Sequence, residues 1–247
     1  MKIIVLGSGT MTSLPDRNPA GYLLLENESA LLLDVGPGII RQLSVLPFPL
    51  TRISTILITH FHPDHYADLV PLLMARFLMQ NDVNRQLTIV GPLGLKERFE
   101  SQARWEGRWL NEHLPRLIEW NGTPFSTDGW WIRAQKTEHT ENSVAYRLER
   151  NGHAVFFSGD TDWQDELIPL AAGTDVAFWE CSLPDNLKQK GHLTPKETGT
   201  LAQKAGVKRL IVTHIYPEND TPDLHERVAA YFSGPITIGR DFLRVQV

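Results

Sequence analysis

The chain has 247 residues, of which 42% are hydrophobic and 21% are charged, and its formal net charge is −5 at pH 7. This composition is typical of a globular protein and excludes disordered, fibrous and membrane-spanning classes. The acidic balance argues against a generally basic surface for nucleic acids, and the single cysteine, Cys181, excludes an internal disulfide framework. We expect one domain over residues 1–247.

The amino terminus also bears on where the protein acts. Residues 1–7 form an apolar strand followed by glycine, without the basic and apolar layout of a signal peptide. No apolar run approaches the roughly 20 residues needed to span a bilayer. We therefore expect a cytoplasmic protein that has no membrane partner.

The first half of the chain alternates short apolar runs with turns rich in glycine and proline. Strands are predicted over residues 2–6, 22–25, 30–33, 53–58 and 87–90. Helices are predicted over residues 39–45, 66–79 and 93–110. The last of these carries Arg98, Arg104, Arg108, Trp105 and Trp109. This helix either binds an anionic or nucleobase-containing ligand or is amphipathic, with tryptophan in the core and arginine in solvent, and we favour the second interpretation.

The second half contains more strands and fewer long helices. Strands are predicted over residues 116–120, 130–136, 143–148, 154–157, 175–179, 209–212, 236–238 and 242–245. Helices are predicted over residues 164–172, 195–205 and 222–232. Strand-rich halves with helices between them predict an α/β fold in which two sheets face each other and the helices lie outside.

A polar motif follows the predicted strand 53–58. It reads Thr59-His60-Phe61-His62-Pro63-Asp64-His65. Residues two apart in an extended segment point the same way, so His60 and His62 share one side. Pro63 breaks the extension, and a turn then directs Asp64 and His65 to a second point nearby. Imidazoles and a carboxylate suit zinc and related metals, so we interpret the motif as metal-binding rather than as a polar turn with surface histidines.

Residues of the same chemical type stand where three later strands end. They are His139, Asp160 and His214, and Thr213-His214 repeats the arrangement of Thr59-His60. A lone histidine at a strand end is more often structural than a ligand. Seven candidates at the same ends of successive strands, however, can converge on one rim of the fold.

These motifs together resemble the metallo-β-lactamase superfamily of binuclear metallohydrolases, over nearly the whole chain. Within it, the chain most resembles the ribonuclease Z-like branch, which includes phosphodiesterases. The segments that carry this finer resemblance are residues 6–10, 15–18 and 33–38 and the motif Gly191-His192-Leu193-Thr194. The resemblance implies the four-layer αββα sandwich of that superfamily.

The resemblance also implies two divalent metal ions and a hydroxide that bridges them as the nucleophile. His60, His62 and His139 would hold the first ion, Asp64, His65 and His214 would hold the second, and Asp160 would bridge them. Zinc is the default from the nitrogen-rich set, with manganese or iron as alternatives.

The candidate catalytic residues are Asp64, His192 and Glu180. His192 matches the histidine that in the family stabilises the phosphoryl group or protonates the leaving oxygen. Glu180 either orients His192 or is an ordinary charge at a strand end. Asp34 is expected to hydrogen-bond a ligand histidine. His113, His153 and His225 match no motif and are interpreted as surface or structural residues.

The interval between His139 and Asp160 departs most clearly from the branch. Its tRNA-processing members carry there a protruding arm that grips tRNA, whereas here residues 140–159 provide two strands and a turn. We therefore expect a phosphodiesterase for a small or nucleotide-like substrate, cyclic phosphates included, without stable tRNA binding. A ribonuclease Z-type tRNA 3′-processing endonuclease, an arylsulfatase or lactonase, and a non-catalytic metal-binding scaffold remain open. Homodimers are common in this branch.

Overall fold

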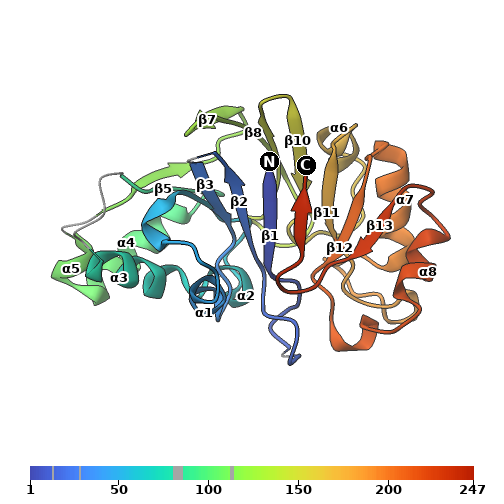
Figure 1. Cartoon of the computed structure of the whole chain (residues 1–247), viewed down its shortest axis with the longest axis horizontal. Helices are drawn as coiled ribbons and strands as arrows, with labels where there is room; N and C mark the ends of the chain where they lie inside the picture. The colour runs from blue at the N-terminus through green and yellow to red at the C-terminus, as the bar shows by residue number, and fades with distance from the viewer. Residues whose placement is uncertain (13, 28, 80–85, 112–113) are drawn as a thin grey trace.

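The computed structural model describes residues 1–12, 14–27, 29–79, 86–111 and 114–247, so the interpretation of His113 as a surface or structural residue lies outside the described residues. Within these ranges the strands form two seven-stranded sheets, and helices cover their outer faces (Figure 1). The predicted four-layer αββα arrangement is confirmed. None of the helices in the same ranges is long and apolar enough to cross a membrane.

The first sheet joins the two ends of the chain, because the last strand pairs with the first. Its order is β14-β1-β2-β3-β4-β5-β6, antiparallel from β14 to β3 and parallel from β3 to β6. The strands are β1 (Lys2–Gly7), β2 (Gly21–Glu26), β3 (Ser29–Leu33), β4 (Ile53–Leu57), β5 (Thr88–Gly91), β6 (Arg116–Glu119) and β14 (Arg244–Gln246).

The second sheet has the same division between antiparallel and parallel pairing. Its order is β13-β12-β11-β10-β9-β8-β7, parallel from β13 to β10 and antiparallel from β10 to β7. The strands are β7 (Phe125–Thr127), β8 (Trp130–Lys136), β9 (Val144–Arg150), β10 (His153–Phe157), β11 (Val176–Glu180), β12 (Leu210–Thr213) and β13 (Ile236–Ile238).

The helices divide between the two outer faces (Figure 1). Helices α1 (Ile39–Ser44), α3 (Leu69–Leu78), α4 (Leu95–Glu106) and α5 (Arg108–Asn111) pack on the first sheet. On the second sheet pack α6 (Leu167–Ala171), α7 (Pro195–Ala205) and α8 (Leu224–Ala229). The short helix α2 (Pro63–Tyr66) lies in the loop after β4.

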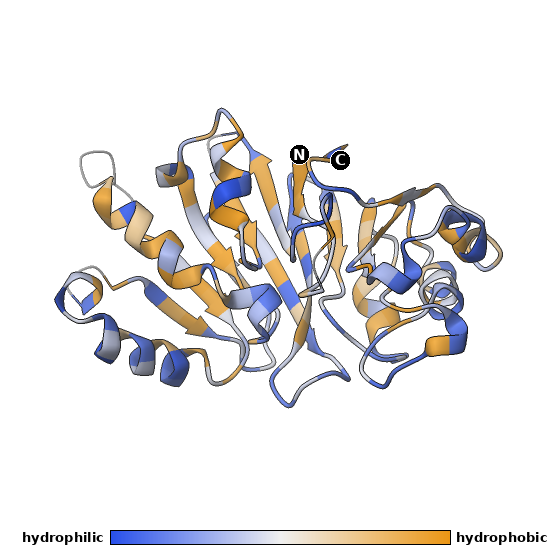
Figure 2. Ribbon diagram, turned by 90° about the horizontal axis from the view of Figure 1, so that it is seen from below, coloured by the Kyte–Doolittle hydropathy of each residue, from blue (hydrophilic) through white to orange (hydrophobic). Residues whose placement is uncertain are grey.

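Strands that are apolar on both faces produce the layered core. In β1, Ile3 and Val5 pack between the sheets, whereas Ile4 and Leu6 pack under the helices of the first sheet. The inner core continues to the second sheet, where Phe157 contributes to the same cluster. The hydrophobic colour of the strands between more polar helix surfaces follows this pattern (Figure 2). Each fully buried aliphatic or aromatic side chain contributes about 1.5–3 kcal/mol, and the resulting rigid sheets fix the positions of the loops at their ends.

Several predicted helices are shorter than expected, among them α6 and α8, and for two others the local reason is clear. The helix predicted over 66–79 is interrupted after Tyr66, because the Asp68 carboxylate accepts a hydrogen bond from the Ile40 amide at 3.1 Å and holds a turn there. The helix predicted over 93–110 ends at Glu106, because Gly107 adopts a φ of 76°, and α5 follows.

The expectation that tryptophan of this segment lies in the core is wrong for Trp105, whose exposure is 89%. Trp109 does pack against the first core, with its ring 5.8 Å from that of Phe77. Strand β7 was not predicted, because a three-residue strand gives too short an alternation to recognise.

Candidate metal centre

Four loops that follow β4, β8, β10 and β12 bring the predicted ligands together. The motif after β4 supplies four of them, and the other three lie one to three residues beyond the ends of the later strands. Their ligand atoms form groups in which all atoms lie within 4.8 Å of one another. The groups are His60, His62, His139 and Asp160; Asp64, His65 and His214; and Asp160, His192 and His214. The first two groups contain the residues of the two predicted shells, whereas the third brings in His192, which was not predicted as a ligand; the role of each residue as a ligand stays a prediction.

The first group surrounds one carboxylate oxygen of Asp160. The Nε2 atoms of His60 and His139 lie 3.7 and 3.6 Å from Oδ2 of Asp160. Nε2 of His139 lies 3.0 Å from Nδ1 of His62. Three imidazoles therefore direct nitrogen atoms toward a single point beside a carboxylate.

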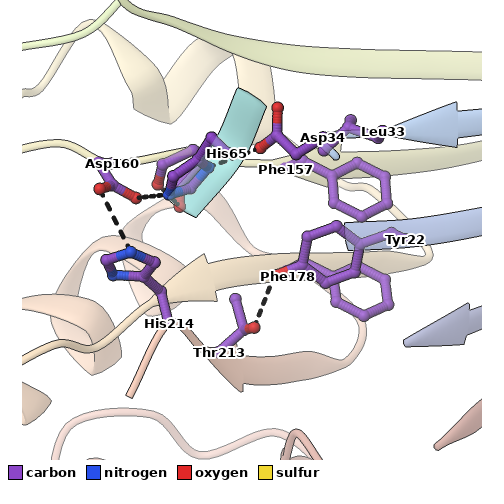
Figure 3. Close-up of a pocket in the computed structure, with 11 residues that line it drawn as sticks. Tyr22, Leu33, Asp34, His65, Phe157, Asp160, Phe178, Thr213 and His214 are labelled. Carbon is purple, nitrogen blue, oxygen red and sulfur yellow. Dashed lines mark hydrogen bonds and ion pairs between the residues drawn. The ribbon is translucent and has the colours of Figure 1, made fainter. Parts of the chain in front are cut away.

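The second group meets the first at the same carboxylate. Nε2 of His214 lies 3.4 Å from Oδ2 of Asp64 and 3.3 Å from Oδ2 of Asp160. Nε2 of His65 lies 3.3 Å from Oδ1 of Asp160. In Figure 3, dashed lines link Asp160 to both His65 and His214, and Tyr22 of β2 lines the same small cavity. Asp160 thus lies where a bridging ligand is predicted.

The donor atoms of this centre fit bound metal ions. Nε2 of His60, Nε2 of His65 and Oδ1 of Asp160 are buried without a hydrogen-bond partner, and the 3.3 Å contact between the last two lacks hydrogen-bond geometry. A buried polar atom without a partner costs about 1–3 kcal/mol, so three of them in one place require compensation. Imidazole nitrogen and carboxylate oxygen are ligands that divalent transition metals take up readily.

The electrostatics of the site favour positive charge. Burial alone would raise the pKa of Asp160, but the surrounding His214, His65 and His60 hold that pKa well below its usual range. Burial also lowers the pKa of His60 well below its ordinary value, with a further contribution from His65. For His65, in contrast, Asp160 and Asp34 outweigh burial and raise the pKa well above its ordinary value. Ionised carboxylates among buried rings are the arrangement that a cation stabilises.

A second layer of contacts orients two of the histidines. Nδ1 of His65 lies 2.8 Å from Oδ2 of Asp34, which confirms the predicted contact between Asp34 and a ligand histidine. Asp34 also accepts hydrogen bonds from the backbone amide and hydroxyl of Thr59, at 2.8 and 2.9 Å. Nδ1 of His139 lies 2.8 Å from the carbonyl oxygen of Gly191. Contacts at Nδ1 leave Nε2 of both rings directed at the centre.

His192 lies at the edge of the cluster and contacts a buried carboxylate. Its Nδ1 lies 3.3 Å from Oε1 of Glu180, a residue with no exposed surface. Burial lowers the pKa of His192, but the charge of Glu180 outweighs burial and raises this pKa to about 9. The contact left open by the sequence, between Glu180 and His192, is therefore present.

Ser182 and Tyr216 belong to the site but were missed in the sequence. The hydroxyl of Ser182 donates to Oε2 of Glu180 and lies 3.3 Å from Nδ1 of His192 and 3.0 Å from Nδ1 of His214. The ring of Tyr216 stands edge-on to those of His192 and His214, with centroids 5.9 Å from each. Their spacing was the signal available in the sequence. Ser182 lies two residues after Glu180, and Tyr216 lies two residues after His214, so each can point to the same side as the candidate before it.

Comparison with known proteins agrees with this geometry. A family model described as a beta-lactamase superfamily domain matches residues 30–215. The chain therefore belongs to the metallo-β-lactamase superfamily, and the coarse assignment as a metal-binding hydrolase of that superfamily is confirmed.

Two kinds of relatives stand out. Ribonuclease Z of Mycobacterium bovis (strain BCG / Pasteur 1173P2) is 29% identical over 276 residues, covering 100% of this chain and 98% of that protein. The crystal structure of YhfI from Bacillus subtilis aligns with a TM-score of 0.88 at 24% identity, covering 99% and 98% of the two chains. That of human tRNase Z, short form, aligns with a TM-score of 0.80 at 23% identity, covering 100% and 99%. The two structures show a shared fold.

Proposed function

We propose that the chain hydrolyses phosphodiesters of small or nucleotide-like molecules, cyclic phosphates included, with two divalent metal ions. His60, His62 and His139 would hold one ion, Asp64, His65 and His214 the other, and Asp160 would bridge them. When bound, such ions lower the pKa of water and neutralise charge on a phosphoryl oxygen. Zinc suits the nitrogen-rich donor set, and manganese or iron can use the same ligands.

The observation that carries the proposal is the extra histidine beside a complete double cluster. His192 lies outside the two predicted ligand shells and is held against the buried Glu180. A histidine held in its charged form hydrogen-bonds an anionic phosphoryl oxygen or delivers a proton to the leaving oxygen. Tyr216, whose ring adjoins His192, adds a neutral hydroxyl donor beside it. Two donors suit the several charged oxygens of a phosphoryl group better than a lactone carbonyl.

The segment between His139 and Asp160 supports a small substrate. Besides short flanking loops, it consists of the hairpin formed by β9 and β10, which pair directly and are joined at Asn151 and Gly152. It contains no protruding insertion, and the net charge of −5 gives little general attraction for tRNA phosphates. The name ribonuclease Z of the 29% identical relative supports phosphodiester chemistry and keeps tRNA 3′ processing as the second candidate.

A substrate panel tests the proposal. The metal-loaded protein should hydrolyse bis(p-nitrophenyl) phosphate or a cyclic nucleotide in preference to p-nitrophenyl phosphate, p-nitrophenyl sulfate and a lactone. The His192→Ala variant should keep its metal content while turnover falls by about 10²–10⁴-fold, the usual contribution of general acid–base catalysis. No turnover of any phosphodiester with zinc, manganese or iron would refute it. Cleavage of a precursor tRNA would favour the second candidate.

We also propose that the protein acts in the cytoplasm as a homodimer. The single cysteine, which is buried, is consistent with a reducing compartment. Light scattering on the purified, metal-loaded chain would measure the mass, and a value near 28.0 kDa would show a monomer instead.

A further inference from the structure

A groove lies between helix α4 and two of the loops that carry the candidate ligands. Its volume is about 450 Å³, within the roughly 300–1,000 Å³ of small-molecule sites. It is lined by Phe61, Glu97, Arg98, Ser101, Gln102 and Asn142. Phe61 stands between His60 and His62, and Asn142 lies in the loop that begins with His139. None of the candidate ligands lines the groove, but it borders the two loops that carry the three histidines of the first metal group.

Arg98 is held in the groove by two aromatic rings. Its guanidinium carbon lies 5.4 Å from the ring centre of Phe61 and 5.0 Å from that of Tyr66. The two rings are nearly perpendicular, at 88°, and the Tyr66 hydroxyl donates to Oε1 of Gln102 at 2.6 Å. Within the described part of the chain, the contacts found for the Arg98 guanidinium are these two rings, with no carboxylate ion pair, and the residue is exposed. Arg98 therefore presents a fixed, flat cation that is open to a ligand.

The other lining groups decide which ligand chemistry fits. Glu97 offers acceptors, the amide of Asn142 offers a donor and an acceptor, and the NH₂ group of Gln102 remains a donor. The carboxylate of Glu97 would repel a second phosphate. A nucleoside has a flat base that stacks on a guanidinium plane, together with base-edge and sugar groups that need both donors and acceptors.

We propose that this groove binds the nucleoside part of the substrate, with the base stacked on Arg98. This inference rests on the proposed function, because it places the scissile phosphodiester at the metal centre and the nucleoside along α4. It makes Arg98 a residue that selects nucleotide esters over simple aryl esters.

The test compares two esters in three variants. The substrates are thymidine 5′-(p-nitrophenyl phosphate), which has a nucleoside, and bis(p-nitrophenyl) phosphate, which has none. Arg98→Ala should lower the ratio of their kcat/KM values by about tenfold, equivalent to about 1.4 kcal/mol and within the range of base stacking on a side chain. Arg98→Lys keeps the charge but loses the plane, so it should lose most of the same preference. Arg104→Ala, an exposed arginine of α4 that does not line the groove, is the matched control and should leave the ratio as in the wild type.

An unchanged ratio in Arg98→Ala, or an equal fall in Arg104→Ala, would overturn the inference. A wild-type ratio in Arg98→Lys would also overturn it, since charge rather than stacking would then suffice. If the wild type hydrolyses neither ester, calorimetry tests the groove separately; the proposed function itself fails only if no phosphodiester is hydrolysed. Thymidine monophosphate should then bind the metal-loaded wild type about tenfold more tightly than Arg98→Ala, with inorganic phosphate affected less. Equal weakening of both ligands would show a phosphate contact and reject a nucleoside site.

Discussion

Glu180 is predicted to act on turnover only through His192. In Glu180→Gln, one oxygen that accepts hydrogen bonds becomes an NH₂ group. In the wild type, the Glu180 carboxylate accepts hydrogen bonds from the backbone amides of Thr161 and Leu193, at 2.6 and 3.1 Å, and from the Ser182 hydroxyl. At least one buried donor loses its acceptor, and the charge that holds His192 is gone. We expect turnover to fall about 10–100-fold, as for the loss of other orienting contacts, which equals about 1.4–2.8 kcal/mol of barrier.

The decisive measurement is a double-mutant cycle on kcat/KM with a phosphodiester substrate. In the wild-type background, Glu180→Gln should lower kcat/KM by the full 10–100-fold. In a His192→Ala background it should lower kcat/KM hardly further, because the histidine through which Glu180 acts is absent. Metal content and urea unfolding serve as controls, since the unsatisfied donor also lowers the free energy of unfolding by about 1–3 kcal/mol. If the substitution lowers kcat/KM by the same factor in both backgrounds, Glu180 supports the loop as a whole and the reasoning is wrong.

The metal centre itself yields two further predictions. Chelation should abolish activity and lower Tm, and titration with zinc should restore both at two ions per chain; full activity after removal would contradict the metal assignment. Asp34→Asn should weaken metal binding about 10–100-fold, because it releases Nδ1 of His65, and asparagine tolerates the φ of 57° at that position. Titration in a metal buffer would measure the affinity, and an unchanged affinity would count against the prediction.

Asp220→Asn should lower the free energy of unfolding by about 3 kcal/mol at pH 7, because it leaves Arg17 buried without its ion pair. The hydrogen bond from Arg17 lowers the pKa of Asp220, so this contribution is complete above the unfolded pKa near 4 and is lost as pH falls through the lowered value. The difference in free energy of unfolding between variant and wild type, measured with urea, should therefore become smaller below about pH 4. A difference that stays constant with pH would argue against the ion pair.

The positions of the candidate ligands could be predicted from sequence because they are local to strand ends. His60, His139, Asp160 and His214 each lie within three residues of a strand end, and the other three candidates follow His60 in the same motif. Parallel strands in the same layer end at the same edge. The motif from Thr59 to His65 also carries its own turn, since Pro63 begins the short helix α2. A residue whose position depends only on a strand end can therefore be placed without knowing the rest of the fold.

The contacts that refine the site depend on loop paths that the sequence does not specify. Glu180 and His192 are 12 positions apart, and their contact requires the intervening loop to return to the strand end. Arg98 meets Phe61 only because α4 packs beside the loop after β4. The helix pattern placed Arg98 on a polar face with Arg104, but only the packing distinguishes the arginine at the groove from the one in solvent. Such long-range side-chain contacts have no periodic signature.

The proposed proton donor and the proposed nucleoside groove come from opposite halves of this chain. His192, with Glu180 and Ser182, belongs to the loops of the second sheet, whereas Arg98 belongs to a helix that covers the first. The metal groups lie between them, because Asp160 from the second sheet meets histidines that follow β4 of the first. On the proposal above, substitutions along α4 should change which molecule reaches the centre while the candidate ligand atoms stay in place. A shared fold and candidate ligand set would then indicate the reaction class and leave the substrate to the groove.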